Sequence, residues 1–299
     1  MGNNIISYSL WGKEPMYTIG AIRNAELAEE IYSDWICRFY VGDDVPEDIV
    51  DELKSFDNTE VITMPHKEND WEAMFWRFYA VTPDAEFVIF RDTDSRLSMR
   101  EYEAVLEWQL SQKSLHIMRD HPYHSEAIMG GMWGCRPRET ISIINREIYA
   151  LIADNVFDRN DKNVIGLETV IDDWLVQQKL RTSDEEHLPE DERGNYLKPH
   201  QYNEKGIDQI FLRYVIYKLL WNDAHIHDSF PIYNCWSGRF DYQPHPNYKE
   251  TNTGFPTIRG KDWNNFVGQV YDQFNNPVEE YANMLEQRDL KIYEDWNES

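Results

Sequence analysis

Residues 86–97, EFVIFRDTDSRL, place an apolar run directly before a turn that holds two aspartates and two arginines. An apolar run of this length, bounded by a polar turn, is typical of a buried strand. Asp92 and Asp94 flank a single residue, so in an extended backbone their side chains project to the same side. Two interpretations follow: a metal-binding pair at the end of a strand, or a polar turn whose carboxylates cap the helix predicted over 98–110.

Around this stretch the sequence alternates between two periodicities. Strands are predicted over residues 4–12, 37–46, 60–65 and 86–90, and helices over 16–35, 46–56, 70–81 and 98–110. This order predicts an α/β fold with a mixed, mostly parallel sheet flanked by helices. Ligands of such sheets bind beyond the carboxyl ends of the strands, which is where the two aspartates fall.

After residue 113 the regular alternation of predicted strands and helices changes. A short strand is predicted over 114–118, and residues 127–137 read as a strand broken by Gly130 and Gly131, where another group must approach the backbone closely. Further predictions are two helices within 138–180, an acidic loop over 181–198, an apolar helix over 206–221 and an acidic C-terminal helix over 279–296. No repeat or low-complexity linker divides the chain, so we expect one domain spanning 1–299.

Composition narrows the range of partners. The 54 acidic and 29 basic residues give a formal net charge of −25, which disfavours nucleic acid and anionic membrane surfaces. Cys37, Cys135 and Cys235 fit neither a disulfide framework nor a zinc motif, which favours a reducing compartment. The sequence shows no signal-like start and no apolar window long enough for a transmembrane segment. We therefore expect a soluble, cytoplasmic protein.

Four segments in this order resemble the GT-A glycosyltransferases, and within them the retaining group that includes glycogenin and bacterial galactosyltransferases. They are MFWRFYA (74–80), FVIFRDTDS (87–95), MGGMWG (129–134) and DQIFL (208–212). The resemblance implies a Rossmann-like GT-A fold, with a nucleotide-binding half over 1–113 and an acceptor-side half with the C-terminal helix over 114–299. By this resemblance Arg77 and Asp92 would contact the donor, although Arg77 could instead pair with an acidic side chain. Ser7, Gly130 and Gly131 are further expected donor-binding residues. Arg259 would reach a diphosphate from a late loop, or else be a surface cation.

The resemblance also implies a metal cofactor. Asp92 and Asp94 would bind Mn²⁺ (or Mg²⁺), ions that prefer carboxylate oxygen and keep positions open for substrate phosphates. A third ligand would be a histidine towards the C-terminal end. The usual His-Gly-Lys context is missing here, and His227 is preferred to His225 because it adjoins the polar turn that follows.

The expected reaction moves a sugar from a nucleoside-diphosphate sugar, with uridine as the expected base, to a hydroxyl of a glycan or other acceptor. By resemblance, Asp208 and Gln209 lie near the reacting sugar. An inverting enzyme would need a base, for which Asp120, Glu126 and Asp208 are candidates. A retaining enzyme would use Asp208 and Gln209 to stabilise the positively charged sugar. Nucleotidyl transfer, diphosphate hydrolysis and non-catalytic sugar binding remain alternatives.

Three histidines, His116, His121 and His124, stand close together in the sequence next to the predicted short strand. Their spacing fits no standard zinc template. We therefore expect them to line the acceptor pocket or to cap loops.

Overall fold

The computed structural model describes residues 3–66, 73–121, 124, 126–138, 140, 207–217, 220–229, 252–257 and 266–278. Within them, an eight-stranded sheet runs in the order β3-β2-β1-β4-β6-β5-β7-β8. Its strands are β1 Asn3–Leu10, β2 Trp35–Gly42, β3 Thr59–Met64, β4 Ala85–Phe90, β5 Leu115–Arg119, β6 Trp133–Cys135, β7 Ala224–Asp228 and β8 Asn252–Thr253.

Only β6 runs against its neighbours β4 and β5, and the other paired strands are parallel. The predicted fold class, a mixed and mostly parallel sheet with flanking helices, is therefore confirmed. Since β4 and β5 both pair antiparallel with β6, all strands except β6 point the same way. Their carboxyl ends form one edge of the sheet. The turn that follows β4 and carries Asp92 and Asp94, here called the D-x-D turn, lies at this edge.

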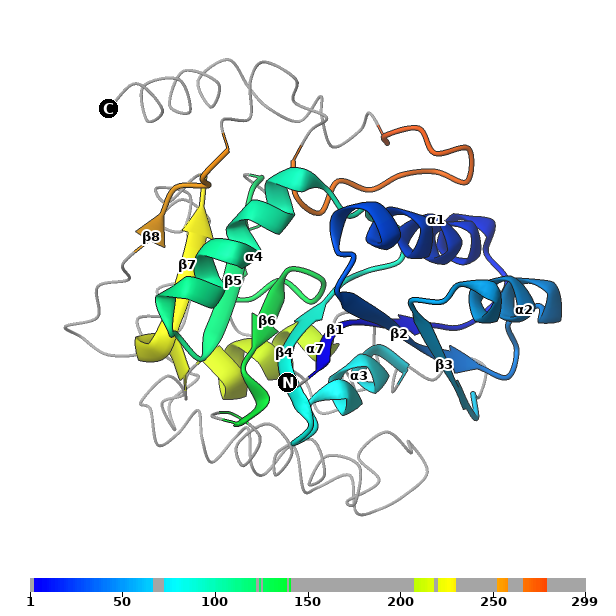
Figure 1. Ribbon diagram of the computed structural model, residues 1–299, viewed down its shortest axis with the longest axis horizontal. Helices are drawn as coiled ribbons and strands as arrows, with labels where there is room; N and C mark the ends of the chain where they lie inside the picture. The colour runs from blue at the N-terminus through cyan, green and yellow to red at the C-terminus, as the bar shows by residue number, and fades with distance from the viewer. Residues whose placement is uncertain are drawn as a thin grey trace, which may run out of the picture.

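The helices cover both faces of the sheet (Figure 1). α1 Pro15–Ile31, α2 Glu47–Ser55 and α4 Met99–Ser111 pack on one face, and α3 Ala73–Trp76 and α7 Ile207–Phe211 on the other. The alternation of strand side chains separates two cores: in β1, Ile5 belongs to the core beneath α3 and α7, and Ile6 to the core beneath α1, α2 and α4. No helix in the described part of the chain is long and apolar enough to cross a membrane.

Three predicted elements differ from those observed. The helix expected over 70–81 is a short α-helix followed by a 3-10 helix, Arg77–Ala80, because side chains of β1 take up the backbone groups of Arg77. The predicted strand 127–137 is reduced to β6, and both glycines lie in the turn before it. The apolar helix predicted over 206–221 begins at Ile207, as α7, and widens into a π-helix over Leu212–Tyr217.

Several predictions lie outside the described residues. These are the helices predicted within 138–180, of which only residues 138 and 140 are described, the acidic loop over 181–198, the C-terminal helix over 279–296, and Arg259.

Candidate functional site

The D-x-D turn is fixed in place by α1. Asn24 donates to the carbonyl of Ser95 at 2.8 Å and accepts from the amide of Leu97 at 3.0 Å. α1 approaches the turn so closely that a Cβ on Gly20 would lie 2.0 Å from the carbonyl oxygen of Thr93. The backbone that presents both aspartates is therefore held before any ligand arrives.

The alternative that the aspartates cap the next helix does not match the structure. The N-cap of α4 is Ser98, whose hydroxyl accepts from the amide of Glu101 at 3.3 Å.

The two arginines of the turn bind other residues of the protein. Arg91 pairs with Glu101 at 2.7 Å, with both side chains 2% exposed, and Arg96 donates to Asn275 at 2.8 Å.

Arg77 joins the turn to α7. Its guanidinium contacts Asp92 at 2.5 Å and Asp208 at 2.6 Å, although the two carboxylates come from segments 116 residues apart. Arg77 and Asp208 are buried, whereas half of the Asp92 side chain, 51%, is exposed. Burial raises the pKa of Asp208, against the opposing effect of Arg77. Its Oδ1 has no hydrogen-bond partner among the described residues.

Ser7 lies behind this arginine. Its side chain is fully buried and donates to the carbonyl of Arg77 at 2.7 Å, while the amide of Arg77 donates to Ser9 at 3.0 Å. The structure therefore places Ser7 where it supports Arg77, away from the cavity that Asp92 faces. Its sequence-based assignment as a direct donor contact does not fit this position.

Gly130 and Gly131 bring the backbone against the same carboxylates. A Cβ on Gly130 would lie 2.6 Å from Asp208 Oδ2, and one on Gly131 would lie 2.1 Å from Asp92 Oδ2. The expectation that another group approaches these glycines closely is confirmed. The groups that do so are the two carboxylates held by Arg77.

Replacing Gly131 with alanine is expected to displace Asp92 and to lower the free energy of unfolding by about 1–3 kcal/mol, because the new methyl group overpacks the site. The other close atom is the backbone nitrogen of Asp92, at 2.9 Å, which cannot rotate away. Gly254→Ala is the matched control, since nothing lies within 4 Å of its Cβ position. Urea denaturation of both variants measures the difference, and equal stability would contradict the close packing described here.

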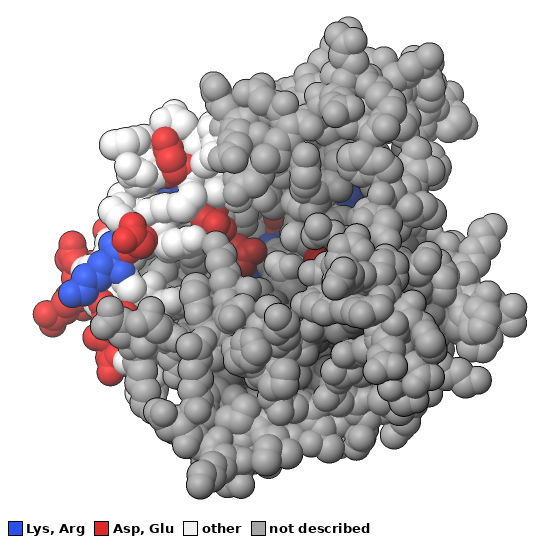
Figure 2. Space-filling model, turned by 180° about the vertical axis from the view of Figure 1, so that it is seen from behind, with Lys and Arg blue, Asp and Glu red and all other residues white. Residues whose placement is uncertain are grey.

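A cavity of about 210 Å³ opens beside the two aspartates. It is lined by Asp92, Asp94, Ser95, His121, His124, Met129, Gly131, Met132, Phe266, Gly268 and Val270. Carboxylate oxygens and imidazoles thus share a pocket with apolar side chains. Where described residues are visible in Figure 2, acidic side chains predominate over basic ones.

Two of the three neighbouring histidines, His121 and His124, line this cavity, as expected for a pocket. The backbone amide of Asp120 donates to Nδ1 of His124 at 3.2 Å, so a neutral His124 carries its proton on Nε2. Phe266 packs against both rings, with centroids 4.6 Å from His121 and 5.7 Å from His124. His116 lies elsewhere, buried beneath α4.

The segment 266–278 covers the D-x-D turn, a contact that the sequence analysis did not predict. The amide of Tyr271 donates to the carbonyl of Asp94 at 2.8 Å, and Val270 bridges to Ser95. The available signals were turn residues: Gly268 and Asn275 both have positive φ, at 83° and 65°. Such residues mark turns without saying where in the fold they dock.

Asp120, proposed from the sequence as a catalytic base, is held in a buried network of hydrogen bonds. It is fully buried and each of its oxygens accepts two hydrogen bonds. Arg100 of α4 binds both oxygens at 2.7 and 2.8 Å, Ser229 donates to Oδ1 at 2.6 Å and the amide of Val267 to Oδ2 at 2.9 Å. A carboxylate saturated in this way cannot accept a substrate proton without breaking these contacts.

His227, expected as the third metal ligand, is not brought to Asp92 and Asp94. It lies fully buried on β7, with Nδ1 2.9 Å from His116 and Nε2 3.1 Å from Glu107 of α4. Both ring nitrogens therefore have partners beneath α4, so the position of His227 does not match its expected role as a ligand beside Asp92 and Asp94. Gln209 follows Asp208 on α7 and is partly buried.

Neither a family model nor a curated protein matches the sequence. Solved structures show partial likeness. The galactosyltransferase LgtC in complex with donor and acceptor sugar analogs is 13% identical, with a TM-score of 0.36 over 82% of this chain and 80% of that one. Mannosyl-3-phosphoglycerate synthase from Rubrobacter xylanophilus is 14% identical, with a TM-score of 0.38 over 66% and 80%. 4-Diphosphocytidyl-2C-methyl-D-erythritol synthase from Anaerococcus prevotii DSM 20548 is 12% identical, with a TM-score of 0.36 over 57% and 85%.

Proposed function

We propose that this chain is a metal-dependent glycosyltransferase that moves a sugar from a nucleoside-diphosphate sugar, with UDP-sugars as the expected donors, to a hydroxyl of a glycan or other acceptor. One observation carries the proposal: Asp92 and Asp94 line a cavity at the carboxyl end of β4, with Arg77 holding one oxygen of Asp92. In a mostly parallel sheet this edge is where ligands bind.

The residues of the turn fit Mn²⁺ or Mg²⁺. These ions accept one or two protein carboxylates and leave their other positions to substrate phosphates and water. Asp92 and Asp208 both pair with the guanidinium of Arg77, and Asp94 lines the cavity together with Asp92, so the carboxylates outnumber this arginine and the site favours a cation. A bound cation would offset the charge that develops on the departing diphosphate.

The protein's own residues have positioning roles in this reaction. Arg77 orients Asp92, and the glycine turn lets the backbone pass close to both carboxylates. Met129, Met132 and Phe266 form an apolar wall beside the aspartates, which limits the access of water.

The acceptor hydroxyl attacks the anomeric carbon as the bond to the diphosphate breaks, and the hydroxyl proton passes to the departing diphosphate. The hydrogen bonds of Asp120 remove one of the three candidate bases of an inverting enzyme. We favour the retaining course, in which Asp208 and Gln209 stabilise the positive charge on the sugar. Asp208 has a buried oxygen with no partner among the described residues, which fits a role that a substrate completes.

The proposal is tested by supplying a panel of nucleoside-diphosphate sugars with Mn²⁺ and measuring the release of nucleoside diphosphate. We expect release with one base, and a loss of about 100-fold or more in Asp94→Asn, because the charge on the leaving group is no longer offset. Asp57→Asn, a change at an exposed aspartate after α2, should leave the rate unaltered.

Two outcomes would contradict the proposal. Release of pyrophosphate from a nucleoside triphosphate would indicate nucleotidyl transfer. Metal-independent binding of sugars without turnover would indicate a sugar-binding protein.

A further inference from the structure

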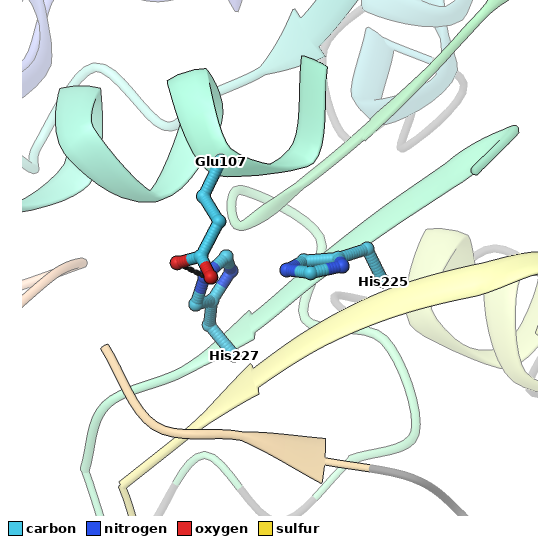
Figure 3. Close-up of side chains that lie close together, drawn as sticks. All are labelled: Glu107, His225 and His227. Carbon is cyan, nitrogen blue, oxygen red and sulfur yellow. Dashed lines mark hydrogen bonds and ion pairs between the residues drawn. The ribbon is translucent and has the colours of Figure 1, made fainter. Parts of the chain in front are cut away.

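A second group of metal-ligating side chains lies beneath α4, apart from the D-x-D turn. Glu107, His225 and His227 each offer one ligand atom, and these atoms lie within 4.8 Å of one another. Figure 3 shows the carboxylate of Glu107 pointing from α4 towards the two imidazole rings on β7. Within the described part of the chain, no other His, Cys, Asp or Glu residues form such a group.

The local sequence explains this convergence. His225 and His227 are two residues apart on β7, so their side chains share one face of the strand. α4 crosses that face, and Glu107 is on its side towards β7. Two imidazoles and one carboxylate therefore come together from two elements that are far apart in the sequence.

We propose that Glu107, His225 and His227 form a second metal site, separate from Asp92 and Asp94, that takes a zinc-like divalent cation. Two histidines and a glutamate are an established ligand set for Zn²⁺, with the fourth position open to water. Imidazole ligands favour Zn²⁺ and similar ions over Mg²⁺ and Mn²⁺, which prefer oxygen alone. The two sites thus differ in the class of metal that their donor atoms select.

The distances suit such an ion after small side-chain movements. Ligand bonds of 2.0–2.1 Å in a tetrahedron place neighbouring ligand atoms roughly 3.4 Å apart. His227 Nε2 and Glu107 Oε2 are 3.1 Å apart, so this pair already has nearly that spacing. His225 would complete the set by moving closer, since its ligand atom lies within 4.8 Å of the other two.

The surroundings provide what a ligating histidine needs. His116 contacts Nδ1 of His227 at 2.9 Å, so His227 can donate its proton there when Nε2 binds a metal. Nε2 of His225 is buried and has no hydrogen-bond partner among the described residues, which leaves its lone pair or proton unsatisfied without a ligand.

The site is open to solvent on the side of Glu107, and a metal bound there would link α4 to β7. The Glu107 side chain is 41% exposed, which gives an ion a route from solvent and leaves room for a water ligand. α4 begins directly after the D-x-D turn and carries Arg100, which binds Asp120. A metal at this site would fasten the middle of α4 to β7, two elements that the turn and the cavity depend on.

The test is a titration of chelator-treated protein with Co²⁺ and then Zn²⁺, read by the visible absorption of tetrahedral cobalt and by calorimetry. We expect one equivalent to bind to the native chain and to Asp94→Asn with the same affinity. Glu107→Gln and His225→Gln should each weaken binding about 100-fold or more, because each removes one of three ligands. Glu52→Gln on the exposed face of α2 is the matched control.

Three outcomes would overturn the proposal: no binding to the native chain, undiminished binding in both ligand variants, or binding that is lost in Asp94→Asn. The last outcome would assign the ion to the D-x-D turn. Melting curves of the metal-depleted variants show whether each one folds. Since the readout is metal binding and not turnover, the result is independent of the proposed glycosyl transfer.

Discussion

Arg77→Met is expected to lower the free energy of unfolding by about 3–5 kcal/mol, the usual cost of removing one partner of a buried ion pair. Arg77 is the only ion-pair partner of Asp208 in the described part of the chain, and the Asp208 side chain is 0% exposed. The variant leaves that carboxylate buried beside Gly130, where it must either stay charged without a counter-ion or take up a proton. Methionine retains most of the arginine's apolar stem, so the loss reports on charge and hydrogen bonds.

Urea denaturation measures this loss, and two further variants test whether it comes from a buried charge without a partner. Arg23→Met breaks the pair with Glu26, whose members are 48% and 42% exposed, and should cost less than about 1 kcal/mol. Arg77→Met combined with Asp208→Leu should recover part of the loss, because no charge then remains buried without a partner. A loss below about 1 kcal/mol for Arg77→Met alone would show that the arginine does not hold the two carboxylates together.

Asp120→Asn is expected to cost a similar amount, about 3–5 kcal/mol, because the guanidinium of Arg100 loses its buried counter-charge. The amide group keeps the shape of the side chain but replaces one acceptor oxygen with a donor. That donor would face Arg100 and either Ser229 or the amide of Val267. The loss should therefore affect the junction of α4, β5, β7 and the segment 266–278 together.

The same variant separates a structural role from a catalytic one for Asp120. Denaturation curves with and without Arg100→Met, and with Asp57→Asn as the exposed control, show whether the loss depends on the arginine. If Asp120→Asn keeps native stability while the release of nucleoside diphosphate disappears, Asp120 is a base after all. In that case the structural role assigned to it here is wrong.

The sheet was predictable because its signals are local. Each strand from β1 to β4 is a short apolar run with its own turn, and alternation with helices leaves few topologies for a parallel sheet. Even the position of Asp92 and Asp94 at the binding edge follows from one strand and its direction. The need for Gly130 and Gly131 was also visible, since paired glycines in an apolar run indicate close approach.

The roles of Asp120 and His227 could not be predicted from the sequence, because they depend on contacts between distant segments. Asp120 looks like any carboxylate beside a glycine-rich strand until Arg100, Ser229 and Val267 are seen around it. The sequence neighbours of His227 favour it as the third metal ligand. Its partners in the structure, His116 and Glu107, are 111 and 120 residues away. Hydrophobic periodicity reports which face of an element is buried, and it does not report which distant polar group lies there.

The central claim is that Asp92 and Asp94 bind the donor through a metal. The most direct test is the thermal stability of the native chain and Asp94→Asn with nucleoside diphosphates, each with and without Mn²⁺. A ligand at a hundred times its dissociation constant adds about 2.7 kcal/mol, enough for a clear shift in Tm. We predict a shift that needs both Mn²⁺ and one particular base and that is absent in Asp94→Asn. An equal shift in that variant, or none with any nucleotide in the native chain, would contradict the claim.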